Sequence, residues 1–181
     1  MMRREYNTES VHNAHLFEIA YVVLPAVSPS AILRSFASAQ GVPTLTATDR
    51  LVEEVTFHVR YAETDAMGIV HHASYIIYFE EGRSNYARQR GSDYASFERS
   101  GYYLAVTEVQ ARYIKPARYD DRITVRCWID EMKSRTLTFG YAIISADSGE
   151  TFVTGYSKHI CITHDGRIAH LPPEWRAWAD K

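Results

Sequence analysis

The fold of this chain is constrained most strongly by one change of hydrophobic period. From Val55 to Tyr61 apolar residues alternate with polar ones, the period of two that is typical of a strand with one buried face. From His72 the apolar positions recur three and four residues apart, as on one side of an amphipathic helix that ends at Gly91. That side comprises Tyr75, Ile76, Phe79, Gly82 and Tyr86. We therefore expect a strand followed directly by one long helix.

Four more strands are predicted after this helix and a short helical turn at residues 93–99. They span residues 102–114, 123–129, 137–143 and 151–163. In the first of them the apolar phase slips between Val106 and Val109, which predicts a β-bulge. A turn at Lys133-Ser134 joins the next two as a hairpin, and Pro172-Pro173 ends the sheet.

This order of elements predicts an α+β domain in which a curved antiparallel β-sheet wraps around the one long helix. The sheet must cover the apolar side of the helix, because no other element is available to do so. Its outer face and open edges would expose Trp128 and similar residues. We therefore expect association into dimers or tetramers.

The chain divides near Asp49. The preceding segment is rich in Ser and Pro and has no sustained period of 2 or 3.6, so residues 1–50 are interpreted as an N-terminal extension. Three alternatives are open for it: disorder, a helix that folds on a partner subunit, or translation upstream of the true start. Residues 51–181 are predicted to form the folded domain.

Composition argues against several functions. The 20 Lys and Arg against 22 Asp and Glu give a formal net charge of −2, which provides no long-range attraction for nucleic acid or an anionic membrane. The longest apolar run, residues 19–27, is interrupted by Pro25 and is shorter than the ~20 residues that span a bilayer. Cys127 and Cys161 lie in separate strand-like runs, so we expect reduced core thiols and a cytoplasmic protein.

Polar residues are densest between Tyr61 and His72, where the first strand leads into the long helix. Asp65 precedes the free N–H groups of a helix start near His72, which can polarise a carbonyl group or stabilise an oxyanion. Gly68 permits a backbone geometry, or a close approach of a ligand, that a side chain would prevent. The same residues also suit an ordinary turn and helix cap, so both interpretations are open.

Other chemistries receive less support. His71 and His72 are adjacent and point in different directions, so a metal site is not expected. Cys161 has no visible group that would activate it as a nucleophile. GxSxG, P-loop and dinucleotide-binding patterns are absent from the sequence. The basic residues expected between strands, which either meet phosphates or are merely solvated, are Lys115, Arg118, Lys133 and Arg135.

Two longer patterns resemble a known family. The first is Tyr61-x-Glu63-Thr64-Asp65-x-x-Gly68-x-Val70-x-His72-x-x-Tyr75-x-x-Tyr78-Phe79-Glu80-x-x-Arg83, and the second is Tyr113-x-x-Pro116-Ala117-Arg118-x-Asp120-Asp121. Both resemble stretches of the 4-hydroxybenzoyl-CoA thioesterase-like branch of the hotdog-fold acyl-CoA thioesterases. The likeness covers residues 51–181, and that fold has the order of elements predicted above.

The resemblance implies an acyl-CoA thioesterase that releases a carboxylic acid and CoA without a metal or redox cofactor. Asp65 is then the catalytic carboxylate, acting as nucleophile or general base, and the N–H at His72 faces the thioester carbonyl. Tyr61 and His72 are supporting site residues. The family binds CoA between subunits with its phosphates near basic loops, which implies Lys133 and Arg135 here.

Two rival functions are open. One is a hotdog hydratase or dehydratase acting on enoyl or hydroxyacyl thioesters, in which an Asp and a His would share the acid and base roles. The other is a non-catalytic acyl-CoA-binding assembly module, with residues 1–50 as its docking segment.

Overall fold

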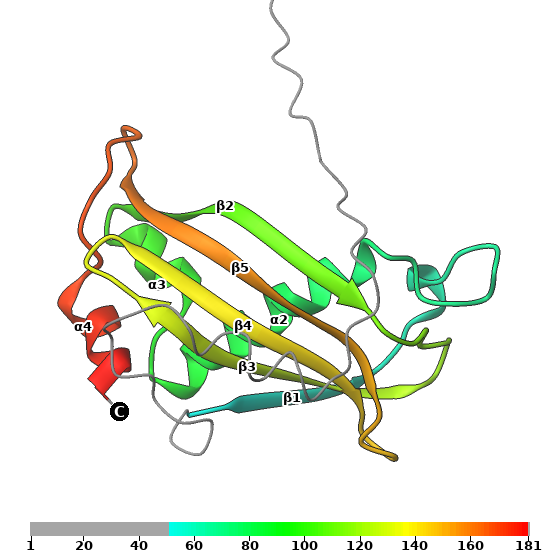
Figure 1. The fold of residues 1–181 in the computed structure, drawn as a ribbon. Coiled ribbons are helices and arrows are strands. Elements are labelled where there is room, and N and C mark those ends of the chain that lie inside the picture. The colour runs from blue at the N-terminus through cyan, green and yellow to red at the C-terminus, as the bar shows by residue number, and fades with distance from the viewer. Residues whose placement is uncertain (1–50, 181) are drawn as a thin grey trace, which may run out of the picture. The chain divides into compact units, whose positions relative to one another are not determined.

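The structure, a computed structural model, describes residues 51–180 (Figure 1). Its strands are β1 (Glu53–His58), β2 (Tyr102–Tyr113), β3 (Arg122–Met132), β4 (Thr136–Ser145) and β5 (Thr151–Thr163). Its helical segments are η1 (Tyr61–Glu63), α2 (Ser74–Gln89), α3 (Tyr94–Arg99), α4 (Pro173–Arg176) and η2 (Ala177–Asp180). The predicted extension, residues 1–50, lies outside the described residues. No helix within 51–180 is long and apolar enough to cross a membrane.

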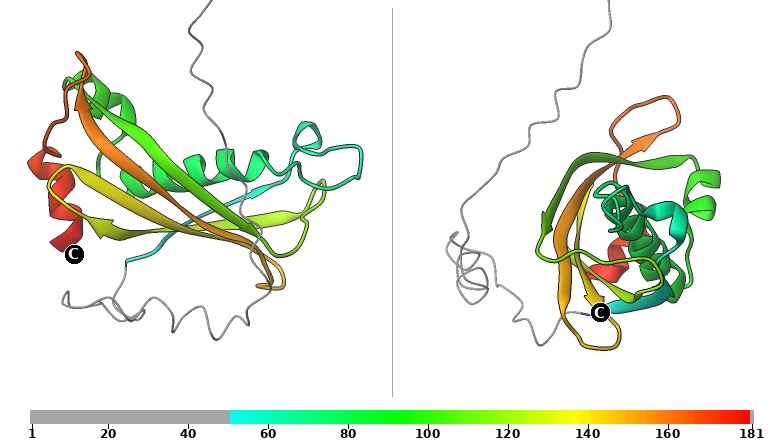
Figure 2. Two further views of the ribbon diagram at one scale, coloured as in Figure 1. Left: turned by 45° about the horizontal axis from the view of Figure 1, so that its top comes forward. Right: turned by 90° about the vertical axis from the view of Figure 1, so that its right-hand side faces the viewer.

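The strands form one sheet in the order β1-β3-β4-β5-β2, and every neighbouring pair is antiparallel. The pairing of β2 with β5 shifts between Val106 and Glu108, which confirms the predicted bulge. The predicted hairpin of β3 and β4 is also confirmed. In Figure 2 the sheet curls around α2, so the predicted α+β hotdog fold is confirmed.

Helix α2 places the predicted face against the sheet, along β1 and β3. Tyr75, Phe79, Gly82 and Tyr86 are all buried, whereas Ile76 is only half-buried. The Phe79 ring stacks on Tyr141 of β4 with ring centroids 4.3 Å apart and planes 8° apart. The helix therefore contacts the sheet through aromatic rings and a glycine.

Glycines allow this close contact. A Cβ atom at Gly155 of β5 would overlap the Gln110 carbonyl oxygen and lie 2.8 Å from two ring carbons of Phe79. A Cβ atom at Gly82 of α2 would lie 2.8 Å from a methyl group of Val125. Because neither glycine has a side chain, the helix and the sheet can approach each other closely at these two positions.

Three details differ from the sequence predictions. The first strand ends at His58, and Tyr61 belongs to the 3-10 turn η1, because the chain bends after Val59. Trp128 is half-buried, since its indole lies over the bare backbone of Gly140. Beyond Pro172 the chain forms α4 and η2, which bury Trp175 and Trp178 against the ends of α2 and α3.

The Gly155→Ala variant tests the close packing of α2 on β5. We expect it to lower the free energy of unfolding by about 3 kcal/mol, the upper end for an overpacked core, because the added methyl group meets backbone as well as Phe79. Chemical denaturation of the wild-type and variant proteins measures this difference.

Gly166→Ala is the matched control, since nothing lies within 4 Å of its added Cβ atom although φ is +81°. It should cost about 1 kcal/mol, from backbone strain alone. Equal losses for the two variants would show that the contact at Gly155 is not tight.

Truncation tests the predicted division of the chain. We expect residues 51–181 to fold alone with a cooperative thermal transition and to keep the activity of the full chain, because the sheet, α2 and the buried core all lie within the described residues. Circular dichroism and an activity assay of both proteins provide the comparison. An insoluble or inactive truncated protein would show that residues 1–50 belong to the core or to an interface.

Candidate active site

The loop between β1 and α2, residues 59–73, is attached to the connection that follows β2. Val59 and the 120–121 segment exchange two backbone hydrogen bonds of 3.0 Å, from Val59 N–H to Asp121 O and from Asp120 N–H to Val59 O. Further along, the Val70 N–H donates to the Ala117 carbonyl at 2.8 Å. The two sequence patterns that carried the family resemblance are thus adjacent in space.

Asp65 opens a tight turn within this β1–α2 loop. Its N–H donates to the Ile69 carbonyl at 2.9 Å, and its own carbonyl accepts from the Gly68 N–H at 2.9 Å. Gly68 has a φ of +70°, which L side chains rarely adopt, so the predicted need for glycine here is structural. Oδ1 of Asp65 accepts from the Met67 N–H at 2.8 Å, and the side chain stays partly exposed. The carboxylate is therefore oriented by the turn and still accessible.

His72 lies two residues before the first residue of α2, Ser74. Its carbonyl accepts from the Tyr113 hydroxyl at 3.0 Å. Its exposed ring lies beside that of His71, with ring centroids 4.1 Å apart, so the expectation that the two side chains point in different directions is wrong. None of the hydrogen bonds within residues 51–180 uses the His72 backbone N–H. An accessible N–H at a helix start can donate to an oxygen atom that gains negative charge.

Tyr61 is strongly exposed, at 76%. Its ring makes an edge-to-face contact with Tyr119 at 5.6 Å, and its carbonyl accepts from the Thr64 hydroxyl at 2.8 Å. Tyr61 thus flanks the turn of Asp65 and faces outward.

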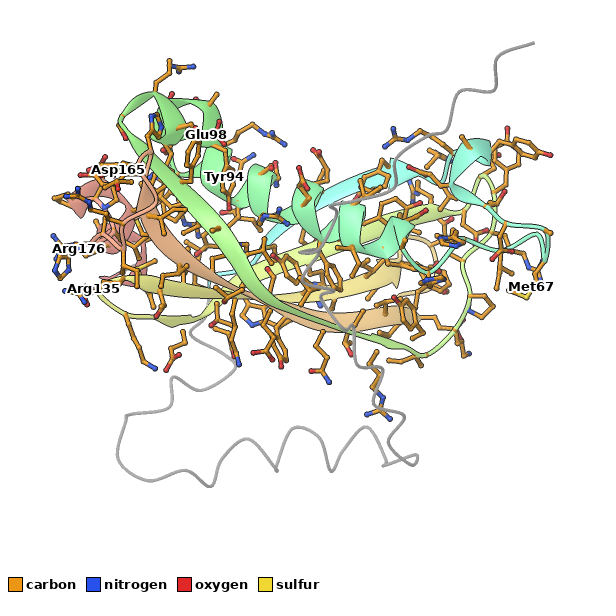
Figure 3. All side chains as sticks on the ribbon, turned by 90° about the horizontal axis from the view of Figure 1, so that it is seen from above. Met67, Tyr94, Glu98, Arg135, Asp165 and Arg176 are labelled. Atoms are coloured by element: carbon orange, nitrogen blue, oxygen red, sulfur yellow. The ribbon has the colours of Figure 1, made fainter. Side chains whose placement is uncertain are left out.

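Lys133 and Arg135 lie in the β3–β4 turn, at the opposite end of the sheet. Figure 3 shows Arg135 and Met67, a neighbour of Asp65, at opposite ends of the domain. β3 alone has 11 residues, which at ~3.3 Å per residue extend about 35 Å. Within one chain these cations cannot meet a ligand held by Asp65, and Lys133 forms an ion pair with Glu131 at 2.8 Å.

Arg118 is the basic residue that lies beside the loop, since its Nη1 donates to the Gly68 carbonyl at 3.4 Å. It lines a polar hollow of about 380 Å³ between the 116–122 segment and the β4–β5 turn. Asp65, His72 and Tyr61 do not line this hollow.

Neither cysteine belongs to the site. Cys127 and Cys161 are both buried and unpaired, as predicted. Burial raises the pKa of both thiols, so they stay protonated and are not nucleophiles. Within residues 51–180 no three His, Cys, Asp or Glu side chains gather in an arrangement that would hold a metal ion.

Two contacts in the loop were not anticipated from the sequence. The Tyr113 hydroxyl donates to the His72 carbonyl, and the Tyr78 hydroxyl donates to Glu63 Oε2 at 2.8 Å. Both tyrosines stand in the quoted patterns, which is the signal that was available, but the patterns do not say which groups meet.

The fold and the loop define a class: a hotdog domain with an accessible carboxylate just before the start of its long helix. Residues 59–179 match the family described as the thioesterase-like superfamily. The chain belongs to this family and is a thioester hydrolase.

Individual relatives match this chain along most of their own length and cover about 70% of it. YneP of Bacillus subtilis (strain 168), provisionally named an acyl-CoA thioesterase, is 31% identical over 72% of this chain and 96% of its own. The crystal structure of TT1821 from Thermus thermophilus is 32% identical, with a TM-score of 0.68 over 72% of this chain and 97% of that one. A DHNA-CoA thioesterase from Staphylococcus aureus is 28% identical, with a TM-score of 0.66 over 71% and 89% of the two chains.

Proposed function

We propose that this protein is an acyl-CoA thioesterase of the 4-hydroxybenzoyl-CoA thioesterase-like branch, which converts acyl-CoA and water into a carboxylic acid and free CoA. The observation that carries the proposal is the accessible Asp65 carboxylate, fixed by its turn in the same loop as the unbonded N–H of His72. Relatives named for acyl-CoA substrates support CoA as the carrier.

The chemistry requires a carboxylate and a hydrogen-bond donor on either side of one carbonyl group. Asp65 either attacks the thioester carbon to form a mixed anhydride, which water then hydrolyses to free the acid and regenerate the carboxylate, or removes a proton from the attacking water. In both routes the carbonyl oxygen becomes negative and the C–S bond breaks to release the CoA thiol. The N–H of His72 donates to that oxygen, an interaction that contributes roughly 3 to 4 kcal/mol when well placed.

Thr64 and Val70 support this geometry because they pair as an antiparallel bridge across the loop. The bridge holds the turn of Asp65 beside the segment that leads to His72. Tyr61 and Gly68 then flank the reacting thioester, one with an exposed ring and the other without a side chain.

The Asp65→Asn variant is the first test. Asparagine keeps an oxygen atom that can accept from the Met67 N–H, but it is neither a nucleophile nor a base. We expect kcat to fall at least ~100-fold with an unchanged thermal midpoint. Release of free thiol from a panel of saturated and aromatic acyl-CoA substrates measures the rate, and crotonyl-CoA absorbance detects hydration of a double bond.

Asp165→Asn is the matched control, since Asp165 lies in an exposed turn at the far end of the domain (Figure 3). It should keep parental turnover. A well-folded Asp65→Asn protein with near-parental thiol release would refute the assignment of Asp65. Loss of crotonyl-CoA absorbance without thiol release would identify a hydratase instead.

The proposed enzyme works as a homodimer or homotetramer, with CoA bound between subunits. β2 is an edge strand of 12 residues, and its backbone donors and acceptors on one side have no strand beside them within residues 51–180. It exposes Tyr103, Val106, Val109 and Tyr113, each 40–50% accessible. A second copy is also what would bring Lys133 and Arg135 to the site that holds Asp65. The reduced thiols agree with a cytoplasmic enzyme.

Val109→Lys tests the association through β2. A charge on this exposed apolar strand should convert the oligomer to monomers and lower activity with it. Light scattering with size-exclusion chromatography gives the mass, and Ile168→Lys, at an exposed apolar residue elsewhere, is the control. A fully active wild-type monomer would contradict the proposal.

A further inference from the structure

Glu63 is a second carboxylate in the loop, two residues before Asp65, and its side chain is only 14% exposed. Its Oε2 accepts from the Tyr78 hydroxyl at 2.8 Å and from the Arg60 backbone N–H at 2.8 Å. Its Oε1 lies 3.1 Å from Nε of Arg60. A carboxylate has about four lone-pair positions, so most of its accepting capacity is already used.

The backbone of Glu63 is equally engaged. Its carbonyl accepts from the His71 N–H at 2.9 Å and from the Ser74 hydroxyl at 3.1 Å. The Glu63 N–H also donates to the Arg60 carbonyl at 3.0 Å. Six contacts therefore meet at one residue, and they join the start of the loop, its end and the first two turns of α2. Asp65 and His72 both lie between the points that these contacts fix.

Tyr78 supplies the contact that reaches furthest into the helix. Its side chain is 1% exposed, with its ring against Phe57 at 5.2 Å and Tyr75 at 5.7 Å. Burial and the bond to Glu63 raise the pKa of Tyr78, so its hydroxyl keeps the proton that it donates. Because the ring is held by packing on both sides, removal of the hydroxyl alone leaves the ring in place.

We propose that Glu63 and the Tyr78 hydroxyl are a positioning pair, which holds the Asp65 turn and the His72 N–H at the spacing that thioester hydrolysis requires. This inference rests on the proposed function. The pair acts through the loop and does not contact the substrate, because the Glu63 oxygens are occupied and the Tyr78 ring is buried. A misplacement of about 1 Å in such a site can lower the rate ~100-fold.

Tyr78→Phe tests this pair. We expect kcat to fall about 30-fold, which is less than the ~100-fold loss for a full misplacement of about 1 Å, while KM changes less than about twofold. The reason is that Glu63 loses one of its two hydrogen bonds to α2 and keeps only the one from Ser74, whereas the groups that bind the rest of the substrate stay in place. Steady-state thiol release measures both constants.

Tyr141→Phe is the matched control. Its hydroxyl is also buried and bonded, to Ser157 Oγ at 2.7 Å, but it lies in the sheet core away from the loop. Both variants lose one buried hydrogen bond, so both thermal midpoints should fall by a similar amount, about 5 °C. Only Tyr78→Phe should lower kcat. Equal kcat values for the two variants would overturn the proposal.

Glu63→Gln gives an independent test, and it is available even if Tyr78→Phe folds poorly. In the glutamine side chain an NH2 group, which is a donor, replaces one carboxylate oxygen that accepts from a donor. The two donors repel each other, so the loop should loosen and kcat should fall by a similar factor, about 30-fold. The double variant Glu63→Gln with Tyr78→Phe should be no slower than the slower single variant, because both remove the same link. Multiplied losses in the double variant would contradict a shared role.

The outcomes separate this inference from the proposed function. Near-parental kcat for Tyr78→Phe and Glu63→Gln, with a collapsed Asp65→Asn, overturns only the positioning pair. An unaffected Asp65→Asn refutes the catalytic role of Asp65, and no thiol release by the wild-type protein across the acyl-CoA panel overturns the proposed function. A kcat lost only in Glu63→Gln identifies Glu63 itself as the catalytic carboxylate and also overturns the pair.

Discussion

At Gly155 of β5 and Gly82 of α2, the helix and the sheet approach so closely that neither position has room for a side chain of its own. The Phe79 ring lies in the space left at Gly155 and stacks on Tyr141. Interiors packed to this density tolerate little displacement, so the height and direction of α2 over the sheet are fixed. Because a helix is rigid over four turns, its first residue, Ser74, is then fixed as well.

The β1–α2 loop depends on that fixed helix start. It must span from the end of β1 to Ser74, and it is attached by backbone hydrogen bonds to the 117–121 segment on one side. On the other side Glu63 attaches it to α2. Because the loop is held on two sides, Asp65 and the His72 N–H, which has no hydrogen bond within residues 51–180, can face solvent without the loop closing over them. Rigid elements support reactive groups on a connecting segment in this way.

The fold was predictable because period and turn residues act locally. The phase slip near Val106 revealed the bulge, since a bulge changes which residues face the core. The 3-10 turn at Tyr61 was missed, because Tyr61 continues the alternating pattern of the first strand and the pattern does not show where the chain bends. The helix with Trp175 was also missed, although Trp175 and Trp178 have helical spacing, because Pro172-Pro173 was interpreted as an ending.

The candidate site was predictable only in part. A motif identifies Asp65 and His72, but the contacts of Tyr78 and Tyr113 with the loop join residues 15 and 41 positions apart, and no local pattern shows which atoms meet. The family resemblance implies that Lys133 and Arg135 reach the site from another subunit. Contacts between subunits are even harder to predict from one sequence than contacts within a chain.

Glu63 and Asp65 show why chemistry follows from environment and not from residue type. Both are carboxylates in one tripeptide, yet Glu63 is mostly buried with three donors around its oxygens, whereas Asp65 is partly exposed with one. A nucleophile or a base needs a lone pair that is free and a path for the substrate to reach it. Asp65 meets both conditions, whereas most of the lone pairs of Glu63 are already used and its side chain is only 14% exposed. In the proposed function, Glu63 therefore positions the site and Asp65 reacts with the substrate, although the two residues are separated only by Thr64.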